Sequence, residues 1–282
     1  MKSIPRQAWP SELHDPSGLR HSGGSESPFH RQAGRGQTMV IDKGLGRSAF
    51  TDLLETAGRY IDCIKFGFGT APLYSTELLL SKIELAKRCG IVVMPGGTLL
   101  ETAVQQNVAG DFFDSVCRLG FDGIEVSDGT IDLPRSRRTE LIKEGCRRGL
   151  RVVTEYGKKL SGSLIDAEEL AATADADWVA GAELVTVEAR ESGVGVGLFD
   201  ENGACHDDAL ESVCRAMGDV SQLMWEAPLK HQQVLLLNTF GPGVHLGNIP
   251  PGEAFSLETM RRGLRSDTFQ FGIRGEAAQY MI

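Results

Sequence analysis

Short runs of aliphatic and β-branched residues recur along the chain from Thr38 onward, and a longer segment with helical spacing of apolar positions follows each run. Glycine ends many of the helical segments, as at Gly58, Gly90 and Gly181, where it is the preferred residue just beyond a helix. The predicted strands cover residues 38–41, 61–66, 91–94, 123–126, 151–155, 183–187, 222–225 and 244–246. The predicted helices cover residues 48–58, 76–89, 98–119 with a break near Gly110, 134–148, 167–180, 207–217, 229–240 and 253–264.

Eight strand–helix units joined by short loops predict a (β/α)8 TIM barrel, an α/β fold. The main alternative is an open doubly wound sheet, whose signature is a G-x-G-x-x-G turn after the first strand. The first predicted strand is instead followed by Asp42-Lys-Gly-Leu-Gly46, so we favour the barrel. We assign residues 37–268 to this catalytic domain.

The two ends of the chain differ from the repeating region. Residues 1–36 are rich in Gly, Pro, Ser and His and carry no apolar period, which predicts a disordered or loosely attached N-terminal tail. Residues 269–282 form a C-terminal extension. The N-terminus lacks the apolar core of a secretory signal.

The composition excludes some classes of partner. The net charge of −9 argues against binding to nucleic acid, because phosphate backbones select basic surfaces. No run of 18 apolar residues is present, so we expect no membrane span. The six cysteines show no C-x-x-C pair, which is typical of free thiols in a reducing cytoplasm, where we place the protein.

Charged and polar residues gather where the predicted strands end. One such residue is more commonly a solvated loop charge or a helix cap than a catalytic group. Repetition at almost every strand end indicates a common site, because the carboxyl ends of barrel strands meet at one face. The set comprises Asp42, Lys43, Lys65, Glu125, Asp128, Glu155, Lys158, Lys159, Glu188, Arg190, Glu191, Glu226 and Asn248.

Three carboxylates lie on consecutive predicted strands: Glu125, Glu155 and Glu188. Carboxylate oxygens are the ligands that hard divalent cations prefer, so this spacing predicts a Mg²⁺ site suited to stabilising an enolate. Gly247-Asn248 follows the eighth strand, where barrels often bind phosphate.

At these residues the sequence resembles the phosphosulfolactate synthase family. The matching stretches are Asp42–Gly46, Ile64–Thr70, Pro95–Thr98, Glu125–Thr130, Gly157–Lys159, Glu188–Gly193, Trp225–Pro228, Leu246–Pro250 and Ser256–Arg265. The resemblance implies a Mg²⁺-dependent barrel enzyme that adds sulfite to phosphoenolpyruvate and gives (2R)-phospho-3-sulfolactate, as in coenzyme M or sulfolactate biosynthesis.

The resemblance also implies roles for residues. Lys158 would act as the general acid, with Mg²⁺ held by the three glutamates. Small anionic substrates would be bound by Lys43, Lys65, Lys159, Arg190, Gly247 and Asn248. A barrel of this family is expected to form a homo-oligomer, and we expect a trimer.

Two other readings of the sequence stay open. The chain could be a family member with changed or lost activity, such as a stress-associated or interaction protein, or a barrel that uses phosphoenolpyruvate with another nucleophile. Tyr156 departs from the family, which has a small aliphatic residue before Gly-Lys-Lys. If its ring faces the barrel interior, it would reshape the pocket.

Overall fold

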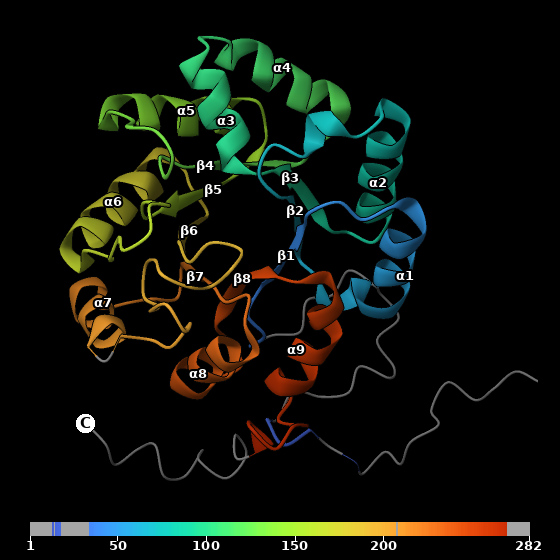
Figure 1. The fold of residues 1–282 in the computed structure, drawn as a ribbon. Helices are drawn as coiled ribbons and strands as arrows, with labels where there is room; N and C mark the ends of the chain where they lie inside the picture. The colour runs from blue at the N-terminus through green and yellow to red at the C-terminus, as the bar shows by residue number, and fades with distance from the viewer. Residues whose placement is uncertain (1–12, 14, 18–33, 207, 270–282) are drawn as a thin grey trace, which may run out of the picture.

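The computed structural model describes residues 13, 15–17, 34–206 and 208–269, and in this part of the chain eight parallel strands form one sheet (Figure 1). Each strand pairs in parallel with its neighbours in the order β3-β2-β1-β8-β7-β6-β5-β4. The ends of this series approach each other, and Asp122 N–H donates to the Val93 carbonyl at 3.0 Å. The predicted (β/α)8 barrel is confirmed. The strands are β1 (Thr38–Asp42), β2 (Cys63–Phe66), β3 (Val92–Pro95), β4 (Gly123–Val126), β5 (Arg151–Tyr156), β6 (Leu184–Val187), β7 (Leu223–Glu226) and β8 (His245–Ile249).

Helices surround the barrel (Figure 1). Two of them follow β3. The sequence predicted a break near Gly110 in the helical segment 98–119, and the break lies slightly earlier, at Asn107, which adopts a φ of 60°. The α-helices are α1 (Arg47–Ala57), α2 (Thr76–Arg88), α3 (Gly97–Gln105), α4 (Ala109–Leu119), α5 (Arg135–Arg147), α6 (Ala167–Ala180), α7 (Ala209–Met217), α8 (Lys230–Phe240) and α9 (Ala254–Arg261). Short 3₁₀ turns are η1 (Gly58–Tyr60), η2 (Ala71–Leu73) and η3 (Pro251–Glu253).

The strands bury both faces, as strands of a parallel sheet covered by helices do. Outward-facing aliphatic side chains pack against the helices in one large core. The barrel interior has its own apolar cluster, which the alternation of side chains along each strand separates from the outer core. Its buried members are Met39, Cys63, Met94, Leu184 and Met224. This cluster fills the barrel, so the interior is packed rather than open.

Parts of the predicted N-terminal tail lie outside the described residues, as do residues 270–282. The described parts contact the barrel through ion pairs. Asp15 is buried and accepts from Arg262 at 3.0 Å. Arg35 pairs with Asp62 and Glu258, each at 2.9 Å. The tail is therefore anchored at these two points.

All six cysteines are free thiols in the structure. Among the described residues, no helix has both the length and the apolar character needed to cross a membrane.

Candidate active site

A pocket of about 280 Å³ opens at the carboxyl ends of the strands. Nine of the polar residues that the sequence pattern singles out line it. They lie on β2, β4, β5, β7 and β8 or in the segments that follow β5 and β6. The lining residues are Ile41, Lys65, Phe68, Gly96, Gly97, Thr98, Glu125, Thr130, Glu155, Lys159, Glu188, Arg190, Glu191, Glu226 and Asn248.

Lys65 lies at the floor of this pocket and is 4% exposed. Its Nζ donates to Glu125 Oε1 at 2.9 Å and to Glu226 Oε1 at 3.1 Å, and it lies 3.7 Å from Glu155 Oε2. Burial alone would lower the pKa of this ammonium, but the three carboxylates raise it above its usual value. Lys65 is therefore a fixed positive charge.

Lys159 is the second cation of the cluster. Its ammonium pairs with the Glu155 carboxylate and lies 2.7 Å from Glu188 Oε2. Burial opposes its charge, but Glu155 and Glu188 raise its pKa. Burial would also raise the pKa of Glu155, yet Lys159 and Lys65 hold that pKa below its usual value. The carboxylates and the two ammonium groups thus stabilise one another.

The glutamate oxygens that come closest together belong to Glu155, Glu188 and Glu226, which offer oxygens within 4.8 Å of one another. Glu125 is not in this group, and it accepts from Lys65 and from the Gly97 N–H, which donates to its Oε2 at 2.8 Å. The pattern of strand ends included Glu226, but the metal prediction did not. The order of strands along the chain did not show that Glu226, on β7, lies beside the glutamates of β5 and of the segment after β6.

The charge of the cluster fits a divalent cation. Four buried carboxylates share two ammonium groups. Burial is the largest cause that raises the pKa of Glu188 well above its usual value, and the negative charges of Glu155 and Glu226 raise it further. The Oδ1 atom of Asn248 is buried without a hydrogen-bond partner among the described residues. An excess of carboxylates and an unpaired amide oxygen are the donor set of an oxygen-ligated cation.

Arg190 and Asn248 line the same pocket with an unusual backbone. Both have positive φ, 60° and 52°, which is uncommon for residues other than glycine. The Glu188 Oε1 atom accepts a hydrogen bond from Arg190 N–H at 2.6 Å, which fixes the turn after β6. The turn thus directs a carboxylate and a guanidinium toward one pocket.

Comparison with known proteins identifies the barrel. The family model described as (2R)-phospho-3-sulfolactate synthase (ComA) matches residues 29–267. This chain belongs to the (2R)-phospho-3-sulfolactate synthase family. It is 39% identical to phosphosulfolactate synthase of Methanothermobacter thermautotrophicus over 83% of this chain and 91% of that protein. It is 40% identical to that of Methanocaldococcus jannaschii over 83% of this chain and 94% of that protein.

A solved structure confirms only the fold of this phosphosulfolactate synthase family member. The YdjI aldolase of Escherichia coli K12 superposes with a TM-score of 0.53 at 12% identity and covers 85% of each chain.

In this family member, three of the predicted site residues lie outside the pocket. Lys158 donates to the carbonyls of Asp128 and Ile131 at 2.8 and 3.2 Å, and its side chain is 44% exposed. Lys43 is exposed. Gly247 is buried deeper, since a Cβ there would lie 2.8 Å from Met39 Cε.

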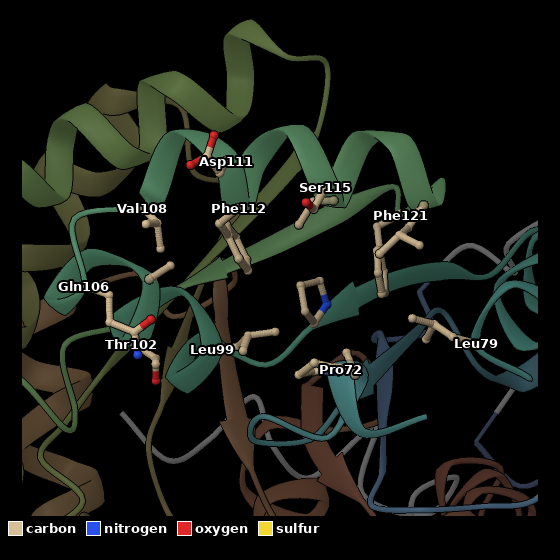
Figure 2. Close-up of a pocket in the computed structure, with 15 residues that line it drawn as sticks. Pro72, Leu79, Leu99, Thr102, Gln106, Val108, Asp111, Phe112, Ser115 and Phe121 are labelled. Carbon is tan, nitrogen blue, oxygen red and sulfur yellow. The ribbon is translucent and has the colours of Figure 1, made fainter. Parts of the chain in front are cut away.

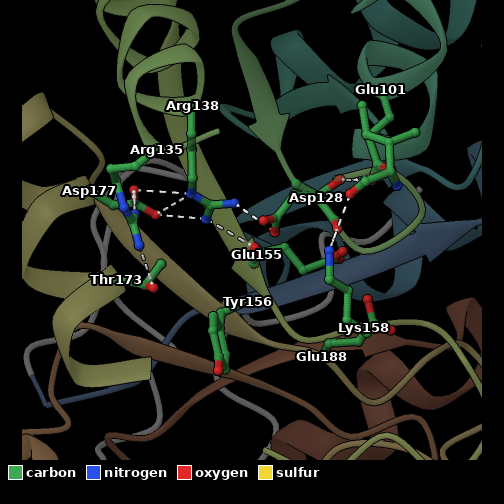
Figure 3. A network of polar contacts seen from close by, with 12 residues as sticks. Glu101, Asp128, Arg135, Arg138, Glu155, Tyr156, Lys158, Thr173, Asp177 and Glu188 are labelled. Atoms are coloured by element: carbon green, nitrogen blue, oxygen red, sulfur yellow. Dashed lines mark hydrogen bonds and ion pairs between the residues drawn. The ribbon is translucent and has the colours of Figure 1, made fainter. Parts of the chain in front are cut away.

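Tyr156 faces outward, toward α6. Its hydroxyl donates to Glu169 Oε2 at 2.9 Å, whereas Glu155 before it faces the pocket (Figure 3). Alternation along β5 separates the two side chains. The Tyr156 ring therefore does not line the pocket.

A second layer of ion pairs holds β5 in place (Figure 3). Arg138, buried on α5, donates to both carboxylate oxygens of Asp177 on α6. Its Nη2 also donates to the Glu155 carbonyl at 3.0 Å and its Nη1 to Asp128 at 3.1 Å. The site glutamate on β5 is thus fixed from behind, and sequence patterns along one element do not reveal this contact.

A separate apolar pocket of about 340 Å³ lies outside the barrel between η2, α2, α3 and α4 (Figure 2). Leu79, Leu99, Phe112 and Phe121 contribute to its walls. Helix α3 lies between the two pockets, since its first residues line the charged one and Leu99 lines the apolar one.

Proposed function

We propose that this protein adds sulfite to phosphoenolpyruvate and forms (2R)-phospho-3-sulfolactate. The observation that carries the proposal is the cluster of Lys65 and Lys159 among four glutamates at the barrel mouth of a phosphosulfolactate synthase family member. The sulfur lone pair of sulfite forms a bond to C3, the C2–C3 π electrons move to the carboxylate, and C2 then takes a proton. The reaction needs no oxidant and has no leaving group.

The reaction brings three anionic groups together, so the pocket must supply positive charge. Lys65, Lys159 and Arg190 line it, and each can pair with phosphate, carboxylate or sulfite. Lys65 and Lys159 are already paired with carboxylates, whereas the structure gives the Arg190 guanidinium no ion pair among the described residues. A guanidinium suits bidentate binding of an anion. The free amide oxygen of Asn248 adds an acceptor.

We assign Mg²⁺ to the same cluster. Glu155, Glu188 and Glu226 would hold it, as the spacing of their oxygens supports. When bound, Mg²⁺ would stabilise negative charge that develops on the substrate carboxylate. The sequence prediction shares Glu155 and Glu188 with this set.

We assign the proton to Lys159 rather than Lys158. Lys159 lines the pocket, and because the carboxylates beside it raise its pKa, it carries a proton before the reaction begins. Lys158 instead ties the loop after β5 to the loop after β4. A proton donor must lie within reach of the carbon it protonates, and of the two neighbouring lysines Lys158 and Lys159 it is Lys159 that lines the pocket.

The test is to incubate purified protein with phosphoenolpyruvate, sulfite and Mg²⁺ and to follow the adduct by ³¹P NMR. We expect an adduct that requires both sulfite and Mg²⁺ and disappears with EDTA. A folded, Mg²⁺-binding sample that forms no adduct would refute the proposal and favour the interaction-protein alternative. An adduct formed with another nucleophile but not with sulfite would favour the third alternative.

A further inference from the structure

Backbone strain is concentrated around the charged pocket. Among the described residues, four other than glycine have positive φ: Phe68, Asn107, Arg190 and Asn248. Three of these four line the pocket, and Asn107 lies at the end of α3. A bulky residue at positive φ is a genuine outlier, and such outliers cluster at functional sites. Phe68, with a φ of 56°, is the bulkiest of them.

The structure holds Phe68 in this conformation from both sides. The Gly96 Cα lies so close that a Cβ there would be 2.9 Å from Phe68 N and 3.0 Å from Phe68 O. Gly67 packs under Ile41, since a Cβ at Gly67 would be 2.9 Å from Ile41 Cδ1. Thr70 closes the turn, because its Oγ1 donates to the Gly67 carbonyl at 2.8 Å. The ring is therefore placed by a rigid turn.

The position of the ring is unusual for an aromatic side chain. Phe68 is 41% exposed, although it borders a pocket lined largely by charged groups. Glycine or asparagine would adopt this φ at lower cost. A strained and half-exposed phenylalanine is best explained by a contact that forms only when the pocket is occupied.

The substrate has one part that fits such a contact. Phosphoenolpyruvate carries a phosphate and a carboxylate, and its only apolar end is the methylene carbon C3. The lining of the pocket is divided in the same way. Its large apolar side chains, Ile41 and Phe68, come from β1 and the segment after β2, whereas Glu155 and Glu188 come from β5 and the segment after β6. Lys65 belongs to β2, but its ammonium reaches across the pocket to Glu125 and Glu226.

We propose that Phe68, supported by Ile41, is a specificity-determining residue whose ring contacts the methylene end of phosphoenolpyruvate and excludes substituents on C3. The inference rests on the proposed function above. Sulfite attacks C3 perpendicular to the plane of the alkene, so a ring at the edge of the methylene leaves this approach open. The ring also keeps the charged ends of the substrate toward Lys159 and Arg190.

The experiment compares phosphoenolpyruvate with its 3-methyl homologue, (Z)-2-phosphoenolbutyrate, as acceptors of sulfite. The wild-type protein is expected to prefer phosphoenolpyruvate by at least about tenfold in kcat/KM, the discrimination typical of one methyl group in a fitted pocket. Phe68→Ala should lower kcat/KM for phosphoenolpyruvate about tenfold and largely remove the preference.

Leu73→Ala is the matched control. Leu73 is 82% exposed on the same connection between β2 and α2 and does not line the pocket, so its removal should leave the preference unchanged. Phe68→Gly guards against misfolding, because glycine adopts this φ freely and should keep or raise the melting temperature while losing selectivity.

The outcomes separate the two proposals. A wild-type protein that forms no adduct would overturn the proposed function. A wild-type protein that forms adduct, with Phe68→Ala and Phe68→Gly both folded and equally selective, would overturn only the role of Phe68.

Discussion

At the scale of single residues, the direction of a side chain decides its role more than its position in a motif. Lys158 and Lys159 are neighbours, yet one ties two loops together and the other lies among the carboxylates. Glu155 and Tyr156 are also neighbours, and the alternation of side chains along β5 points them to opposite faces of the strand. The Gly-Lys-Lys motif could be read from the sequence, but the choice between its two lysines could not, because the loop after β5 leaves the regular strand geometry.

Replacing Lys159 should remove proton delivery. We expect Lys159→Arg to keep the ion pairs with Glu155 and Glu188 but to lower kcat by about 100- to 10,000-fold, because a guanidinium does not give up its proton. Lys158→Ala is the control and should keep most of the wild-type kcat. Single-turnover rates measured by ³¹P NMR would decide, and equal losses in the two variants would contradict the assignment of the proton to Lys159.

At the scale of elements, the start of α3 forms part of the site. The Gly97 N–H holds Glu125, and Gly96 allows the close approach of Phe68. The sequence predicted a helix from residue 98 after the third strand. It did not show that the first turn of this helix faces the pocket, because that depends on how the segment after β3 crosses the barrel mouth.

A methyl group at Gly97 should disturb this arrangement. In Gly97→Ala the new Cβ would lie 2.3 Å from Ser127 Oγ and 3.1 Å from Glu125 Oε2, so one of them must move. We expect kcat/KM to fall about 100-fold, as displacements of about 1 Å do.

Gly110→Ala in α4 is the control for this substitution. No atom lies within 4 Å of its Cβ position, so it should keep full activity and gain up to about 1 kcal/mol in unfolding free energy. Steady-state kinetics and urea unfolding test both variants. An active Gly97→Ala would show that the contact with Glu125 is dispensable.

At the scale of the whole molecule, the barrel concentrates charged side chains at one end. The stability of the fold does not require these charges. Four glutamates from four strands share two lysines in a buried cluster. Burying carboxylates costs free energy unless they are paired, and the raised pKa of Glu188 reflects that cost. We expect such a site to lower the free energy of unfolding of the empty protein, and binding of substrate or a cation to restore it.

The stability of the protein without Mg²⁺ should therefore depend on pH through Glu188. Because its folded pKa lies above the ordinary value of 4.5, its contribution to stability is full below that pH and is lost as pH rises toward the folded pKa. The slope is about 1.4 kcal/mol per pH unit within this window. Glu155, whose folded pKa is lowered, acts in the opposite sense and only below about pH 4.5.

Glu188→Gln should remove this slope and make the protein without Mg²⁺ at least as stable as the wild type at neutral pH. Chemical unfolding in EDTA across pH 4.5–8 measures the free energy of unfolding and its slope with pH. Glu77→Gln is the control, because that side chain is 87% exposed and should not alter the profile. A Glu188→Gln protein whose stability follows the same pH dependence as the wild type would contradict the account.

The sequence by itself determined the barrel, the order of its elements and the strand ends where charges gather, because these depend on periodicity along the chain. Only the tertiary structure decided which of those charges meet. It placed Glu226 beside Glu155 and Glu188, turned Lys158 away, and set Phe68 in a strained turn at the pocket wall. Barrel closure brings β7 and β2 to the same mouth as β5, and distances across that mouth are not encoded in the spacing of residues along any one strand.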